Sequence, residues 1–199
     1  KLAAADIRQL VMMLRQTANA SLTYNQVETL PLNDILSISR NQVIREPFGV
    51  VAAITPWNFP LVLAMWKIAP ALAMGNSIVL KPASDTPLGS LLLAQLAVEA
   101  GIPKGVLNVV AGKGSEAGEA LVRHPDVNKI AFTGSTEVGK TIMKQAADTV
   151  KKVTLELGGK SAAIVMPDAD LEVAVPGILF GVFFHSGQVC ESGTRLIVH

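Results

Sequence analysis

The sequence predicts an α/β protein in which a parallel sheet carries helices on both faces. From Phe48 onward, short runs rich in β-branched residues alternate with helical stretches, which is the pattern of strand–helix–strand units. Several strand-like runs are apolar throughout, as expected for strands that are buried on both faces. Half of the 199 residues are hydrophobic and 17% are charged, so the chain has enough apolar side chains for a sizeable core.

The elements can be assigned in chain order. Residues 1–19 are expected to form an amphipathic helix because apolar residues recur at helical spacing. Residues 20–46 are polar and alternating, and we expect strands there that could pair with another subunit. Further strands are expected at 50–55, 77–80, 106–110, 127–132, 152–155 and 162–165, and helices at 61–74, 87–100, 115–123, 137–149 and 171–184. Gly75 and Gly101 close helices, and Pro87 opens one.

The strict alternation stops near Gly158 and Gly159. We therefore expect two parts, a dinucleotide-binding domain over residues 1–157 and the beginning of a second α/β domain, catalytic and truncated, over 158–199. The first residue is Lys, and the last residue follows directly on a strand-like run. The sequence is expected to be a piece of a longer polypeptide.

Composition argues against several classes of partner. The net charge is +1, from 17 basic and 16 acidic residues without a long run of one sign, which argues against nucleic acid. Prolines and Lys67 interrupt the longest apolar stretches, so we expect no membrane span. A single cysteine suits a reducing compartment, and we expect a cytoplasmic protein. It leaves no CxxC for zinc, and no metal site is expected.

That single cysteine, Cys190, lies in a polar, glycine-containing turn after an apolar stretch. Gly187 and Gly193 flank it, and Glu191 follows it directly. A structural cysteine usually lies inside an apolar segment, whereas an exposed thiol at the end of a buried element is a candidate nucleophile. An unremarkable surface or core cysteine is the alternative.

Two further residues suit chemistry at a carbonyl group. Glu156 lies between two leucines at a strand end, and partial burial there would favour a general base; an ion pair with Lys152 or Lys160 is the alternative. Asn58 lies between an aromatic residue and a proline in a rigid turn. Its amide could donate to an oxyanion, or it could simply cap the next helix.

Two glycine-containing loops each follow a strand and precede a helix. The loop from Gly112 to Gly118 has the form GxGxxxG, which suits a pyrophosphate at a helix N-terminus, although a plain loop explains it equally well. The string from Gly134 to Thr141 matches GxxxxGK[ST]. Because Lys140 would lie a full turn inside a helix capped by Ser135 or Thr136, nucleotide triphosphate hydrolysis is disfavoured.

Five strings in order, PWNFP, KPAS, FTGSTEVG, LELGGK and GQVC, resemble the aldehyde dehydrogenase superfamily. The resemblance runs from about Arg45 to the last residue. It implies a Rossmann-like fold, NAD or NADP as cofactor, a small-molecule aldehyde as substrate and a homo-oligomeric parent protein.

By this resemblance Cys190 is the nucleophile, Glu156 the general base and Asn58 the oxyanion donor. The implied cofactor contacts are Ile54, Thr55, Pro56, Trp57, Lys81, Ser84, Gly114, Phe132, Thr133, Gly134, Ser135, Val138, Gly139 and Leu157. Many NAD-preferring members have glutamate where this chain has Ser84, so NADP is admissible.

The reaction that the resemblance implies is oxidation of an aldehyde to a carboxylic acid through a cysteine thiohemiacetal and a thioester. Two alternatives stay open. In the acylating branch coenzyme A resolves the thioester, and that branch tends to lack a base like Glu156. In the other alternative this piece, or a parent protein that lost activity, is a binding or structural module that holds dinucleotide without turnover; the family's later motif for the nicotinamide ribose is absent from these 199 residues.

Overall fold

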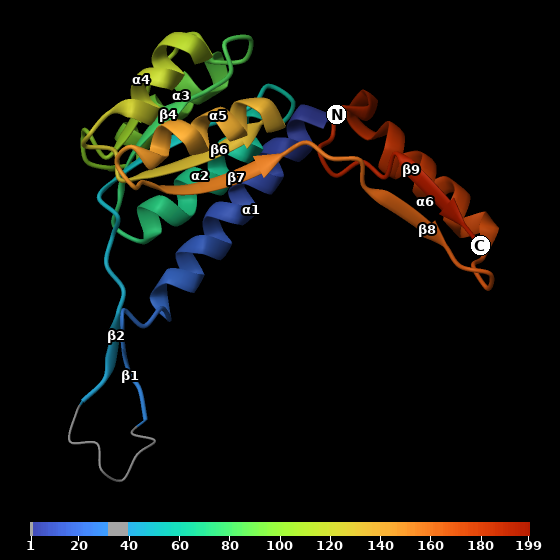
Figure 1. The fold of residues 1–199 in the computed structure, drawn as a ribbon, viewed down its shortest axis with the longest axis horizontal. Helices are drawn as coiled ribbons and strands as arrows, with labels where there is room; N and C mark the ends of the chain where they lie inside the picture. Colours follow the sequence, from blue (N-terminus) through green and yellow to red (C-terminus); the bar gives the residue numbers. More distant parts are fainter. Residues whose placement is uncertain (1, 32–39) are drawn as a thin grey trace.

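The computed structural model describes residues 2–31 and 40–199. Its centre is a five-stranded parallel sheet (Figure 1), which confirms the predicted fold class. The strand order is β5-β4-β3-β6-β7. The strands are β3 (Val50–Ile54), β4 (Ser77–Lys81), β5 (Leu107–Val109), β6 (Lys129–Gly134) and β7 (Lys152–Leu157). From β3 the chain first builds one side of the sheet and then returns to build the other.

Helices cover the two faces unequally. On one face α2 (Pro60–Ala73) and α3 (Leu88–Glu99) pack against β3, β4 and β5, and α1 (Leu2–Leu22) packs on α2. On the other face α4 (Glu119–Arg123) and α5 (Thr136–Ala147) pack against β3, β6 and β7. Ala52 and Ala53 of β3 are fully buried on opposite faces, as expected for a central strand of a parallel sheet.

The C-terminal part extends away from this sheet as an arm, which we define as residues 160–199 (Figure 1). It contains β8 (Ala162–Val165), α6 (Leu171–Phe183), a short 3₁₀ turn (Phe184–Gly187) and β9 (Arg195–Val198). β8 and β9 pair in parallel, with Ala162 opposite Arg195. Parallel strands joined through a helix form an α/β unit, which agrees with the expected start of a second α/β part.

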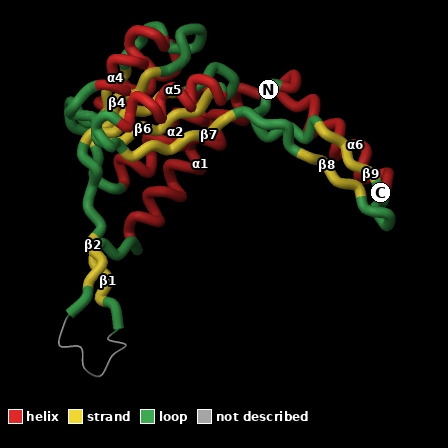
Figure 2. Tube along the Cα trace, viewed as in Figure 1, coloured by secondary structure: helices red, strands yellow, loops and turns green. Residues whose placement is uncertain are grey.

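A second projection leaves the sheet near its opposite end (Figure 2). It contains β1 (Val27–Thr29) and β2 (Gln42–Ile44), which pair with each other in an antiparallel ladder. The polar alternation of residues 20–46 therefore does give strands. The segment 32–39 lies outside the described residues. Pairing of these strands with another subunit stays a prediction.

Two local features differ from the predicted elements. β7 runs two residues farther than expected, to Leu157, so Glu156 lies inside the strand. The segment expected as one helix from residue 115 begins as a π-helical turn, Gly114–Gly118, before α4. Among the helices of the described residues, none combines the length and the apolar character needed to cross a lipid bilayer.

Candidate active site

The residues expected to bind a cofactor lie at the carboxyl ends of the strands or in the segments that follow them. β3 and β6 lie side by side where the strand order reverses, and such a point is where doubly wound sheets bind ligands. The loop after β3 carries Thr55 to Asn58, and β6 ends at Gly134. The sheet therefore brings the predicted residues of these two segments to one edge, together with those at the ends of β4 and β7 and in the loops after β4 and β5.

Asn58 and the cysteine turn meet although they are far apart in the sequence. The Asn58 side-chain amide Nδ2 donates a hydrogen bond of 2.7 Å to the backbone carbonyl of Gln188. Gln188 is two residues before Cys190. A primary amide has two N–H donors, so one fixes the side chain and the second is left for another acceptor. Of the two interpretations of Asn58, this arrangement favours the oxyanion donor.

Cys190 is exposed, and its turn is held from two sides. The buried Ser192 hydroxyl lies 3.3 Å from the carbonyl oxygens of both Gly181 and Val182 in α6. On the other side lies Gly159, where a Cβ would stand 3.6 Å from the carbonyl oxygen of Cys190. The loop after β7 therefore touches the backbone of the cysteine, which brings the end of the Glu156 strand to this turn.

The expectation that the neighbouring leucines bury Glu156 is wrong. Side chains alternate between the two faces of a strand. Leu155 and Leu157 pack against the buried cluster that includes Ile142 of α5, whereas Glu156 is exposed on the opposite face. No ion pair joins Glu156 to Lys152 or Lys160 among the described residues. The carboxylate is therefore accessible to water at the edge of a cavity.

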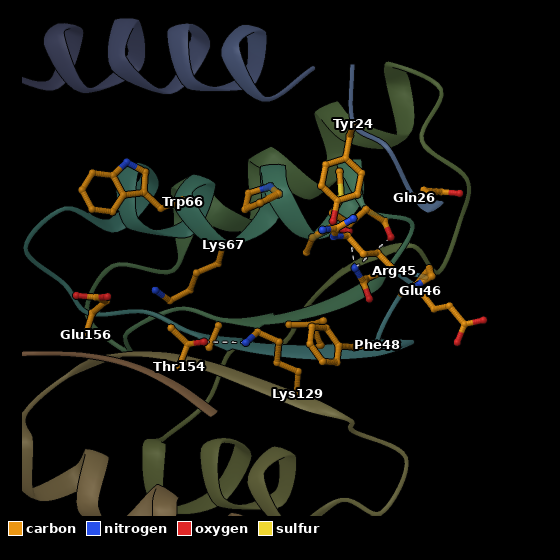
Figure 3. A pocket seen from close by; sticks show the side chains of 17 residues that line it. Tyr24, Gln26, Arg45, Glu46, Phe48, Trp66, Lys67, Lys129, Thr154 and Glu156 are labelled. Carbon is orange, nitrogen blue, oxygen red and sulfur yellow. Dashed lines mark hydrogen bonds between the residues drawn. The ribbon is translucent and has the colours of Figure 1, made fainter. Parts of the chain in front are cut away.

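That cavity, of about 520 Å³, lies between α2 and a face of β6 and β7 that no helix of the described residues covers. Trp66 and Lys67 of α2 and Lys129, Thr154 and Glu156 of the sheet line it (Figure 3). Parallel sheets are ordinarily covered on both faces. This part of the sheet is uncovered in the described chain, and both apolar and charged side chains line the cavity above it.

Lys67 is a site residue that the sequence reasoning did not single out. Its ammonium Nζ donates to the Thr133 hydroxyl at 2.6 Å, and Thr133 is the register partner of Glu156. Burial lowers the pKa of Lys67 to about 8, and the nearby Glu156 carboxylate acts in the opposite direction. The signal was available, because Lys67 is the only charged residue in the apolar run of α2.

The loop between β6 and α5 forms a helix N-terminus. Ser135 is the N-cap, and its hydroxyl accepts from the Val138 N–H at 3.4 Å. Lys140 lies in the second turn of the helix and not at its start, where a triphosphate-binding loop has its lysine. The triphosphate-hydrolysis interpretation is therefore disfavoured, as the sequence indicated. Gly139 allows the close approach of α5 to β7, since a Cβ there would be 2.7 Å from Leu157 Cδ2.

Lys81 is the last residue of β4 and Ser84 lies in the loop that follows, and both already have hydrogen bonds. The buried Lys81 ammonium donates to the Pro82 carbonyl at 2.8 Å, and burial lowers the pKa of this lysine. The exposed Ser84 hydroxyl donates to the Gly112 carbonyl at 3.1 Å. The β4 loop is therefore tied to the glycine loop after β5.

Thr55, directly after β3, carries a buried polar group without a partner. The Thr55 hydroxyl is nearly inaccessible, and no hydrogen-bond partner for it exists among the described residues. Buried hydroxyls ordinarily find a partner. In the adjacent loop nothing lies within 4 Å of a Cβ on Gly114, so its backbone is open to close approach. An orphaned hydroxyl, an open glycine backbone and the α5 N-terminus together suit a polar, anionic ligand.

The model of the aldehyde dehydrogenase family matches residues 1–199. The chain belongs to the aldehyde dehydrogenase family. It is 60% identical over 161 residues to a phenylacetaldehyde dehydrogenase of Pseudomonas fluorescens, covering 81% of this chain and 32% of that protein. It is 53% identical over 177 residues to an NADP/NAD-dependent aldehyde dehydrogenase of Escherichia coli (strain K12), covering 88% of this chain and 35% of that protein.

Solved structures of aldehyde dehydrogenases agree with this fold. The NAD+ complex of an aldehyde dehydrogenase from Bacillus cereus matches with a TM-score of 0.92 and 49% identity, over 98% of this chain and 39% of that chain. This aldehyde dehydrogenase chain therefore spans about a third of the length of the curated relatives named above.

Proposed function

We propose that the polypeptide carrying this chain oxidises a small-molecule aldehyde to a carboxylic acid with NAD(P)+. The balanced reaction is aldehyde + NAD(P)+ + water → carboxylic acid + NAD(P)H + H+. The observation that carries the proposal is the 2.7 Å hydrogen bond from Asn58 to Gln188. It ties an amide donor at the end of β3 to the turn that holds the only thiol of the chain. A nucleophile and an oxyanion donor are the two groups that carbonyl addition needs.

In the proposed mechanism the Cys190 thiolate adds to the aldehyde carbon and forms a thiohemiacetal. The free N–H of the Asn58 amide and the Cys190 backbone N–H donate to the developing oxyanion. Removal of one such donor in enzymes of this kind costs roughly 10²–10³ in turnover. The chemistry that bound NAD(P)+ supplies is acceptance of a hydride. Loss of that hydride leaves an acyl group on Cys190 as a thioester.

Glu156 is proposed to complete the reaction. Its carboxylate takes a proton from water, whose oxygen adds to the thioester carbon, and the Cys190 thiolate leaves as the carbon–sulfur bond breaks. The exposure of Glu156 supports this role because the base must be reached by water. The presence of this base favours hydrolysis over transfer of the acyl group to coenzyme A, because the acylating branch tends to lack it.

The edge of the sheet fits a dinucleotide. We propose that the groups of the loops after β3, β4, β5 and β6 and of β7 hold it, as the resemblance implies. The Thr55 hydroxyl without a partner, the open backbone at Gly114 and the α5 N-terminus support this proposal. Residues 1–157 would then be the dinucleotide-binding domain, and residues 158–199 the start of the catalytic domain.

The relatives' names indicate the class of substrate. Phenylacetaldehyde and betaine aldehyde appear among them, and we extend only the aldehyde group to this protein. We further propose that the complete protein is a homo-oligomer, with the β1–β2 hairpin as a candidate contact.

The test is to incubate the complete protein with NAD(P)+ and a panel of aliphatic and aromatic aldehydes and to follow the formation of NAD(P)H by its absorbance. Formation of one equivalent of carboxylic acid per NAD(P)H supports the proposal. A requirement for coenzyme A, with an acyl-coenzyme A product, would replace it by the acylating alternative. Dinucleotide binding without NAD(P)H formation would indicate a binding protein.

A further inference from the structure

The turn before Cys190 has an unusual backbone. Three successive residues, His185, Ser186 and Gly187, have positive φ values of 52°, 59° and 75°. Glycine adopts this left-handed region freely, but the other two residues do so at a cost in free energy. Such backbone persists only where the surrounding contacts hold it, and it gathers at functional sites. The contacts of His185 therefore matter.

The imidazole ring of His185 stacks on the ring of Phe59, with centroids 4.5 Å apart and planes inclined by 26°. The ring of Phe184 also stacks on the ring of Phe59, with centroids 6.3 Å apart and planes inclined by 21°. The described residues offer no hydrogen-bond partner to the His185 side chain within bonding distance. The face of its ring, rather than its nitrogens, makes the contact.

Phe59 directly follows Asn58, and it is the residue before the first turn of α2. The stack and the Asn58–Gln188 hydrogen bond thus join the same two segments, residues 58–59 and 185–188. Among the described residues that hydrogen bond is the one polar link between the arm and the sheet. Without the His185 stack, the contacts left between these two segments would be this hydrogen bond, two residues from the thiol, and the more distant ring of Phe184.

We propose that His185 is a positioning residue for the nucleophile. Its ring holds the cysteine turn against Phe59, so that the Asn58 amide and the Cys190 thiol stay aimed at the same carbonyl group. The proposal rests on the proposed function for the roles of Asn58 and Cys190. It assigns to His185 neither contact with substrate nor transfer of a proton.

A cofactor-free reaction isolates this effect. In acylation by p-nitrophenyl acetate, the thiolate of Cys190 adds to the ester carbon, an oxyanion forms, and nitrophenolate leaves with the electron pair of the broken carbon–oxygen bond. In alkylation by iodoacetamide, the same sulfur displaces iodide and no oxyanion forms. Both reactions are carried out on the complete protein. After digestion, mass spectrometry of the peptide that contains Cys190 gives the rate of each modification. Only acylation needs the Asn58 amide.

We expect His185→Ala to slow acylation about tenfold, equivalent to about 1.4 kcal/mol, and to change alkylation by less than about threefold. His185→Phe keeps the ring face and should retain acylation within about threefold of the wild type. The matched control, His124→Ala, removes an exposed histidine on another loop and should change neither rate. Asn58→Ala should slow acylation, and adding His185→Ala to it should cause little further loss, because His185 acts by keeping the Asn58 amide and the thiol aimed at one carbonyl group.

Four results would overturn the proposal: wild-type acylation in His185→Ala, equal loss of acylation and alkylation in that variant, failure of His185→Phe to restore the rate, or additive losses in the double variant. Asn58-dependent acylation without aldehyde oxidation would refute the proposed function alone. The outcome for His185 is still decided in that case, because neither reagent needs a dinucleotide.

Discussion

The ammonium Nζ of Lys67 donates to the hydroxyl of Thr133 across 2.6 Å and thereby links α2 to the end of β6. Since Thr133 pairs in register with Glu156 on β7, an amine and a carboxylate face the same cavity (Figure 3). Desolvation disfavours the charged amine more than the carboxylate favours it, so the pKa of Lys67 falls to about 8.

This pKa predicts a dependence of stability on pH. The unfolded lysine keeps a pKa of 10.5, so between pH 8 and 10.5 the unfolded chain binds more protons than the folded chain. Stability due to this group therefore rises with pH across that window, and below pH 8 the folded state carries the full cost, about 3 kcal/mol. Lys67→Met lacks this group, so its free energy of unfolding should lie above that of wild type by about 3 kcal/mol more at pH 8 than at pH 10.5. Urea unfolding at a series of pH values measures this difference.

The control is Lys144→Met, which removes an exposed lysine on α5. Its difference from wild type should stay constant over the same window. A constant difference for Lys67→Met as well would show that the amine is solvated in the folded protein.

Cys190→Ala should abolish aldehyde oxidation in the complete protein while leaving dinucleotide affinity within about threefold, because the thiol forms the bond to substrate. Turnover and a fluorescence titration with NAD(P)H provide the two measurements. Cys190→Ser is the closer control, since it keeps a weaker nucleophile of similar size. Aldehyde oxidation by the alanine variant at the wild-type rate would refute covalent catalysis at this residue.

Glu156→Gln should separate the two halves of the reaction. The amide cannot take a proton from water, so deacylation should slow by about 10²–10⁴-fold while the first turnover is less affected. Rapid mixing should then give a burst of NAD(P)H followed by a slow steady state. Equal slowing of the burst and the steady state would point instead to a role of Glu156 in activating Cys190.

Val150 offers a prediction about stability alone. It follows α5 with a φ of 53°, and its side chain is 87% exposed, so it has little packing to lose. A β-branched residue is strained in this region, whereas asparagine tolerates it. Val150→Asn should raise the free energy of unfolding by about 1 kcal/mol. Val110→Asn, at an exposed valine without positive φ, should give no such gain in the same thermal or urea unfolding experiment.

Much of the fold could be predicted because the signals are local. Apolar runs, helical periodicity and closing glycines indicated the alternating elements, and the five strands of the sheet lie close to the expected ranges. The arm's own strand pair was half predicted: β8 was expected, and the strand-like run at the end became β9, its parallel partner. Register between distant segments has no such local signal.

The errors at the site have the same origin. Flanking leucines indicated burial of Glu156, but alternation along β7 sends Leu155 and Leu157 to the α5 face and leaves the carboxylate exposed. The link from Asn58 to Gln188 spans 130 positions, and no spacing rule predicts it. Lys67 was noticed only as a break in an apolar stretch, because its partner, Thr133, comes from a strand far along the chain.

We expect cofactor choice to depend on the loop after β4, where the resemblance places Ser84 at the adenosine ribose. Ser84 is neutral and exposed where a carboxylate would repel a 2′-phosphate, and its hydroxyl donates to Gly112. The Lys81 ammonium lies three residues away but is buried against the Pro82 carbonyl. We expect use of NADP+ within about tenfold of NAD+ in kcat/KM, a gap of about 1.4 kcal/mol.

Ser84→Glu should shift this preference towards NAD+, mainly by repelling the phosphate rather than by a new attraction. Ser84→Gln is the matched control, because it has the size of glutamate without its charge; it should change the ratio of the two kcat/KM values less than Ser84→Glu does. Equal effects of the two substitutions would mean that the size of the side chain, and not its charge, decides. A thousandfold preference for NAD+ in the unmutated protein would contradict the role assigned to Ser84, since a neutral residue there gives no repulsion of that size.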